Sequence, residues 1–141
     1  MRKRTRLSTS YRPSEAEEFM NPRQLEYFRQ KLLKWKGELI EESNQTLQNM
    51  QEESLAQPDL ADRATAETDR SLELRTRDRF RKLISKIDSA LKSIDEGTYG
   101  YCEETGEPIS LKRLEARPIA TLSVEAQERH ERLERTRRDE A

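Results

Sequence analysis

The sequence has 141 residues, of which 39% are charged and 32% hydrophobic, so it cannot fill a large spherical core. Lysine and arginine number 27 against 28 acidic residues, and the resulting net charge of −1 argues against duplex DNA as the main partner. The single cysteine, Cys102, excludes an intramolecular disulfide, and no uncharged run is long enough to span a membrane. We therefore expect a cytoplasmic protein with no membrane contact.

Residues 1–20 combine basic residues with few apolar positions, and we expect a flexible or partly helical tail there. Asn21-Pro22 then predicts a helix start, because asparagine is a favoured N-cap and proline suits the first helical position.

The next segment has apolar residues at alternating spacings of three and four, which predicts a coiled-coil seam. The seam residues are Leu25, Phe28, Leu32, Trp35 and Leu39. Farther along the seam becomes thinner, and Pro58 ends the predicted helix.

A second helix is expected from about Asp62 to Glu96, where Gly97 provides a C-cap. Its seam residues are Phe80, Ile84, Ile87, Leu91 and Ile94. Two long helices joined by a short break predict an antiparallel hairpin over residues 21–97, with its tip at 58–64.

After Gly97 the composition changes. Glycines, a proline and aromatic residues over 98–123 predict a small turn-rich knuckle, and residues 124–141 have helical propensity. The predicted fold class is mainly α: a long antiparallel helical hairpin on a small, degenerate zinc-ribbon-like domain with a C-terminal helix.

No pattern indicates an enzyme. The single histidine, His130, lies in a charged helix, and the sequence has no phosphate-binding loop or catalytic triad. We therefore assign no catalytic residue.

The knuckle has the spacing of a four-ligand zinc site, but its four positions hold Cys102, Thr105, Ser123 and Ala126. Alanine cannot bind zinc and neutral hydroxyls are poor ligands. We expect no structural zinc, no other cofactor and no redox partner for Cys102.

Asp59 and Asp62 lie at the predicted hairpin tip. Acidic residues favour helix N-termini, so helix capping explains them without any function. Their position at the end of an arm, where no core needs them, also suits contact with a metal ion, a basic loop or the interior of a larger machine. Both interpretations remain open.

The sequence resembles the DksA family of RNA polymerase-binding factors over roughly residues 20 to 135. The resemblance depends on four stretches: Asp59–Ala64, Leu72–Arg79, Gly97–Glu103 and Arg113–Pro118. Because three family cysteine positions hold other residues, the chain is similar to a cysteine-poor, zinc-independent member.

The resemblance implies that the hairpin enters the secondary channel of RNA polymerase and that Asp59, Asp62 and Ala64 act near the catalytic centre. It also implies action with ppGpp to repress ribosomal RNA promoters and activate amino-acid biosynthesis promoters in the stringent response. The matching ppGpp-site positions are Leu83, Lys86 and Arg117, and Gln127 replaces a further basic residue. Ordinary surface charge explains Lys86 and Arg117 equally well.

The partners expected are thus RNA polymerase and ppGpp, for a monomer without sequence-specific DNA binding. Two other classes of function stay open: a structural coiled-coil adaptor, and a degenerate zinc ribbon that binds nucleic acid directly. The adaptor would tolerate tip substitutions, and the nucleic-acid binder would shift DNA in a salt-dependent manner.

Overall fold

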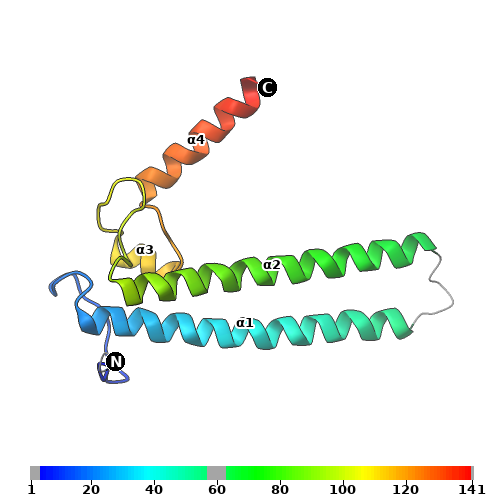
Figure 1. The fold of residues 1–141 in the computed structure, drawn as a ribbon, viewed down its shortest axis with the longest axis horizontal. Helices are drawn as coiled ribbons and strands as arrows, with labels where there is room; N and C mark the ends of the chain where they lie inside the picture. The colour runs from blue at the N-terminus through cyan, green and yellow to red at the C-terminus, as the bar shows by residue number, and fades with distance from the viewer. Residues whose placement is uncertain (1–3, 57–62, 141) are drawn as a thin grey trace. The chain divides into compact units, whose positions relative to one another are not determined.

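The structure is a computed structural model that describes residues 4–56 and 63–140. It contains four helices in these ranges: α1 (Pro22–Ala56), α2 (Arg63–Glu96), α3 (Leu111–Ala116) and α4 (Val124–Glu140) (Figure 1). The described residues form no strand beyond an isolated bridge between Tyr101 and Pro108. The predicted fold class, a helical hairpin with a small domain and a C-terminal helix, is confirmed.

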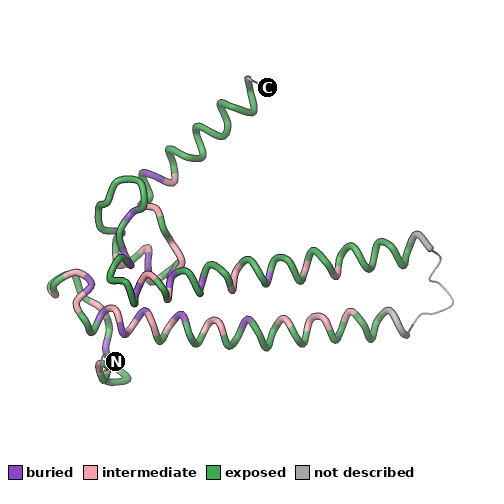
Figure 2. Tube along the Cα trace, viewed as in Figure 1, coloured by how far each residue is buried: buried purple, intermediate pink, exposed green. Residues whose placement is uncertain are grey.

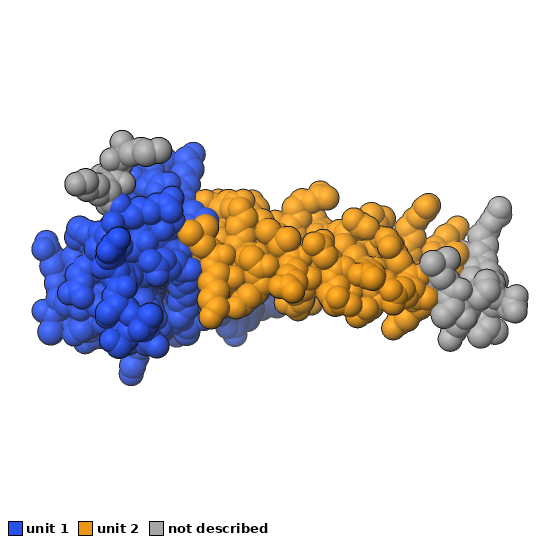
Figure 3. Space-filling view, turned by 90° about the horizontal axis from the view of Figure 1, so that it is seen from below, with its two compact units in different colours: residues 1–32, 90–141 blue, residues 33–89 orange. Residues whose placement is uncertain are grey.

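The chain divides into two compact units (Figure 3). Unit 1 comprises residues 1–32 and 90–141, and unit 2 comprises residues 33–89. Unit 1 therefore contains the start of α1, the end of α2, the knuckle and α4, whereas unit 2 contains the remainder of the two long helices.

The ends of both long helices follow the predicted capping chemistry. The Asn21 side chain accepts hydrogen bonds from the backbone N–H groups of Arg23 and Gln24, at 2.9 and 3.1 Å. At the C-terminal end of α2, Gly97 adopts a positive φ of 79°, and the Thr98 N–H donates to the Ser93 carbonyl at 2.9 Å. Glycine tolerates this left-handed conformation without a steric cost, so it ends α2 cleanly.

The predicted seam is buried where it is richest in apolar residues. The buried seam residues are Phe28, Leu32, Leu39, Phe80, Ile87 and Ile94. In contrast, no described residue of 40–53 or 65–79 is buried (Figure 2). These outer segments are helical without a core of their own.

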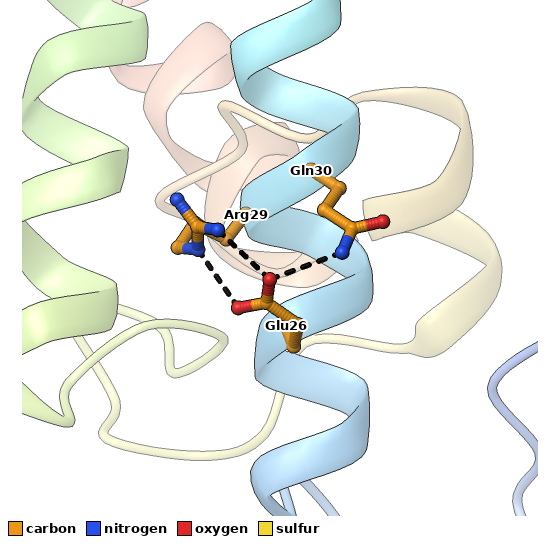
Figure 4. A network of polar contacts seen from close by, with 3 residues as sticks. All are labelled: Glu26, Arg29 and Gln30. Atoms are coloured by element: carbon orange, nitrogen blue, oxygen red, sulfur yellow. Dashed lines mark hydrogen bonds and ion pairs between the residues drawn. The ribbon is translucent and has the colours of Figure 1, made fainter. Parts of the chain in front are cut away.

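A buried carboxylate also lies near the start of α1. Glu26 accepts two hydrogen bonds of 2.8 Å from the Arg29 guanidinium and one of 3.0 Å from Gln30 (Figure 4). The hydrogen bonds from Arg29 hold the pKa of Glu26 below its usual range, although burial opposes this. The charge is thus compensated inside unit 1, as a buried charge must be.

The N-terminal segment differs from the expected flexible tail. Tyr11 and Met20 are buried, and residues of this segment make side-chain hydrogen bonds to one another and to α1. The segment lacks apolar periodicity, so its packing depends on contacts that a periodicity search does not detect.

No helix in the described part of the chain is long and apolar enough to cross a lipid bilayer.

Candidate functional site

A shallow hollow lies along one face of α2 in unit 2. It is lined by Arg75, Asp78, Arg79, Lys82, Leu83 and Lys86. The four basic residues follow one another at spacings of four, three and four, which places them on one helix face. The hollow therefore presents four cations around one carboxylate.

Only part of this positive charge is neutralised within the chain. Lys82 forms an ion pair with Asp78, with 2.9 Å between Nζ and Oδ2. Arg75, Arg79 and Lys86 are exposed and have no ion-pair partner among the residues that the structure describes. Their donors are available to an anion, and arginine can bind phosphate or carboxylate groups through two parallel hydrogen bonds.

Two of the predicted effector residues, Leu83 and Lys86, lie together in this hollow. The third, Arg117, belongs to unit 1, where it is the exposed C-cap of α3. Its backbone N–H donates to the Arg113 carbonyl at 2.7 Å. The half-buried Gln127 side chain, at the substituted position, donates to Glu131 at 3.3 Å.

Residues Asp59 and Asp62, predicted to act at the hairpin tip, lie outside the described residues. Ala64, the third predicted tip residue, is the second residue of α2. The functional assignment of these three residues therefore stays a prediction.

Cys102 is buried in the knuckle, and its sulfur accepts several hydrogen bonds. Burial alone would raise the pKa of the thiol. However, hydrogen bonds from the Thr105 hydroxyl and from backbone N–H groups of Ser123, Thr105 and Glu104 outweigh burial and lower the pKa to about 6. The loop thus favours a thiolate at this position, as expected where donors surround a sulfur atom.

The other three positions of the cysteine pattern have different surroundings. Thr105 is exposed, whereas Ser123 and Ala126 are buried. Ser123 caps α4, because its hydroxyl accepts a hydrogen bond from the Ala126 N–H at 3.2 Å. The serine is therefore used for helix capping, and the alanine side chain fills space beside it.

Sequence reasoning did not identify Arg75, Arg79 and Lys82 as members of a site. Their alternating four-three spacing was available in the sequence, but they were interspersed with other charged residues such as Arg77, Asp78 and Arg81. Only the helix face shows which of these charges lie together.

Two family models match the chain, one ending before Gly97 and one beginning at it. Residues 24–94 match "DnaK suppressor protein DksA, N-terminal domain", and residues 97–132 match "Prokaryotic dksA/traR C4-type zinc finger". The first match alone spans half of the chain.

Curated proteins and a solved structure are similar over most of the chain. The "RNA polymerase-binding transcription factor DksA" of Caulobacter vibrioides is 68% identical over 94% of this chain and 93% of its own length. The protein of the same name from Escherichia coli K12 is 46% identical, with 82% of this chain and 76% of its own length covered. The structure of transcription factor DksA2 from Pseudomonas aeruginosa is 38% identical, with a TM-score of 0.65, and covers 87% of this chain and 93% of its own.

The expectation that the chain needs no structural zinc was wrong. The match of residues 97–132 to a C4-type zinc finger family indicates zinc binding. The expectation of no zinc depended only on the four residues at the ligand positions. The zinc finger family match, in contrast, covers residues 97–132, which include the whole knuckle and the start of α4.

The side chains present do not provide a four-thiolate zinc site. The four positions hold one thiol, at Cys102, and the described residues contain no group of three or more histidine, cysteine, aspartate or glutamate side chains that could hold a metal ion. Structural zinc sites need four such donors. No step of the function described below is therefore assigned to zinc.

Proposed function

We propose that this chain, a member of the DksA family as its resemblance predicted, binds RNA polymerase and regulates transcription. The observation that carries this proposal is the high identity to a curated RNA polymerase-binding factor along nearly the whole chain. The curated relatives are named as transcription factors, which supports a regulator rather than an enzyme.

The proposed mechanism places the hairpin of α1 and α2 in the secondary channel of RNA polymerase. Asp59, Asp62 and Ala64 would then act near the polymerase catalytic centre and alter the open complex. The outer segments 40–53 and 65–79 support this role, because none of their described residues is used in a core. Their surfaces are therefore available to a partner.

The effector of the proposed mechanism is ppGpp, bound with the help of Leu83, Lys86 and Arg117. The unneutralised cations of the α2 hollow support an anionic ligand there. Lys86 would serve as a point charge for a phosphate, and Arg117 could bind a phosphate through its guanidinium fork. With this effector, the factor would repress ribosomal RNA promoters and activate amino-acid biosynthesis promoters in the cytoplasm, as part of the stringent response.

A first experiment separates polymerase binding from tip function. The purified protein should co-purify with RNA polymerase core enzyme, and Asp62→Asn should keep this binding but lose repression of a ribosomal promoter in vitro. Asp69→Asn is the matched control, because Asp69 is an exposed carboxylate of α2. Equal repression by the Asp62 variant and the control would argue against a role for the tip, and absent co-purification would refute polymerase binding.

A second experiment tests the effector residues. Lys86→Ala should weaken ppGpp binding to the factor–polymerase complex by about tenfold, as expected when a charged hydrogen bond to phosphate is lost. Lys92→Ala provides the control, because Lys92 is an exposed lysine of α2 that does not line the hollow. Unchanged affinity in the Lys86 variant would remove that residue from the proposed site.

A further inference from the structure

Residues 8–21, which precede α1 within unit 1, form an irregular segment that we call the strap. Two of its side chains, Tyr11 and Met20, are buried, although the strap has no helix or strand. A segment without regular structure stays in place only if specific contacts offset the entropy of ordering it. The strap has three groups of such contacts.

The first group centres on Gln24, which is fully buried in the first turns of α1. Its side-chain oxygen accepts the Met20 N–H at 2.8 Å, and its amide nitrogen donates to the Ser14 carbonyl at 3.2 Å. One buried glutamine thus satisfies a backbone donor and a backbone acceptor from two separate points of the strap. Breaking either bond inside the unit would leave a buried polar group without its partner.

The second group centres on Tyr11. Its hydroxyl donates to Glu17 at 2.8 Å, its ring lies 4.6 Å from the Arg23 guanidinium carbon, and its edge contacts the Tyr27 ring at a centroid distance of 6.1 Å. Aromatic edge contacts and cation–π contacts both stabilise packing beyond the burial of apolar area. The contacts with Arg23 and Tyr27 hold the Tyr11 part of the strap against α1.

The third group joins the strap to the knuckle. Phe19 meets Tyr101 edge to face, with 5.4 Å between ring centroids. Met20, at a φ of 53°, packs so closely against Gly100 that a β-carbon at that glycine would lie 3.0 Å from Met20 Cγ. Gly100 also has a positive φ of 93°, so glycine suits this position both sterically and conformationally.

The knuckle is small and has little regular structure. Its regular structure is limited to the short helix α3 and the bridge between Tyr101 and Pro108. Hydrogen bonds such as Cys102 N–H to Glu107 and Ile109 N–H to Gly100 link its loops. Its core consists of a few buried side chains, such as Tyr99, Cys102, Ile109 and Leu114. A module of this size gains stability from packing against the rest of its unit.

We propose that the strap is a clamp that holds the knuckle on the first turns of α1. The contacts of Gln24 and Tyr11 hold the strap against α1. Phe19 and Met20 of the strap in turn contact Tyr101 and Gly100 of the knuckle. Release of the strap and local opening of the knuckle are therefore coupled.

Hydrogen exchange on the full-length protein tests the clamp. Phe19→Ala should accelerate exchange of the Cys102 and Ile109 amides by about three- to tenfold, the range expected for loss of one aromatic pair. Amides of residues 33–53 in α1 should keep their exchange rates. Leu133→Ala is the matched control, because it removes an exposed apolar side chain from the same unit.

A double-mutant cycle shows whether the ring contact carries the coupling. In a Tyr101→Ala background, Phe19→Ala should add little further acceleration, because its partner ring is already absent. The milder Phe19→Leu should produce a smaller rise at the same amides, and it replaces Phe19→Ala if that variant does not fold.

Three results would overturn the proposal. These are unchanged knuckle exchange in both Phe19 variants, the same acceleration by Phe19→Ala with and without Tyr101, and equal acceleration in the knuckle and in residues 33–53. The last result would indicate a global loss of stability instead of a clamp.

Discussion

Two regions of the same pair of helices are stabilised in different ways. In the part of α1 and α2 that belongs to unit 1, Phe28, Leu32 and Ile94 are buried, and the Glu26 carboxylate is fully bonded. In residues 40–53 and 65–79 of unit 2, no described residue is buried. The outer helices depend mainly on helical propensity and exposed ion pairs such as Arg77–Glu73, at 2.7 Å.

This difference indicates how the helices divide their tasks. Positions in a packed core are constrained by volume, so most substitutions there are costly. Positions in 40–53 and 65–79 have no such constraint, and their charges and exposed apolar residues can be selected for contact with a partner.

Truncation of a buried ring should separate the two regions most clearly. Phe28→Ala should reduce the free energy of unfolding by about 3–5 kcal/mol, because Phe28 is fully buried. Leu72→Ala, at a residue 47% exposed, should change it by no more than about 0.5 kcal/mol. Urea unfolding followed by circular dichroism measures both, and similar losses in the two variants would contradict the contrast.

A buried hydroxyl should have an intermediate effect. Tyr99 donates to the Pro118 carbonyl at 2.8 Å, and burial raises its pKa far above the usual range. Tyr99→Phe should cost about 1–3 kcal/mol, because a buried carbonyl loses its donor. Thermal unfolding of Tyr99→Phe and of the control Tyr101→Phe, at a residue 39% exposed, measures the loss of stability in each variant. Equal losses in the two variants would show that water replaces the missing hydroxyl.

Alkaline pH should weaken the contact between α1 and α3. Burial, and then the hydrogen bond and charge of Glu115, raise the pKa of Tyr27 to about 12. Because the folded-state pKa is raised, this contribution is complete below pH 10 and is lost as pH rises from about 10 to about 12.

Spectrophotometric titration of tyrosine checks this expectation, with Tyr27→Phe identifying the Tyr27 step. Glu115→Gln should lower the pKa of Tyr27, since the charge that disfavours the phenolate is removed. A Tyr27 step that does not move in this variant would show that Glu115 has no such influence.

An exposed ion pair in unit 2 should have the smallest effect. Lys36 and Asp88 approach to 2.7 Å between Nζ and Oδ1, but the Asp88 side chain is about half exposed. Asp88→Asn should therefore cost only about 0.2–1 kcal/mol and should cost less still at high salt. A loss above 2 kcal/mol in chemical denaturation would indicate that charge, and not the apolar seam, holds this part of the hairpin.

Local sequence patterns predicted most of the helical framework. The seam spacing located the buried faces of α1 and α2, and Asn21 and Gly97 marked helix ends. Two separate long helices, α1 ending at Ala56 and α2 beginning at Arg63, agree with the predicted hairpin. These features depend on interactions within a few residues along the chain, and such interactions are visible in sequence periodicity and capping chemistry.

The strap and the basic hollow were not predicted. Tyr11 and Met20 have no periodic apolar neighbours, and their burial depends on partners elsewhere in unit 1, such as Gly100. The hollow residues share one helix face but are separated in sequence by other charges. The zinc expectation is contradicted by the match of residues 97–132 to a C4-type zinc finger family, although Cys102 is the one thiol among the four ligand positions.

The sequence by itself therefore determined the two long helices, their seam and the family to which the chain belongs. Only the tertiary structure decided that residues 8–21 lie packed as a strap and that Gln24 is buried with both the oxygen and the nitrogen of its side-chain amide hydrogen-bonded. The physical reason is the range of the interactions. Helix caps and heptads are local, whereas the burial of an irregular segment depends on surfaces that form only when distant parts of the chain meet.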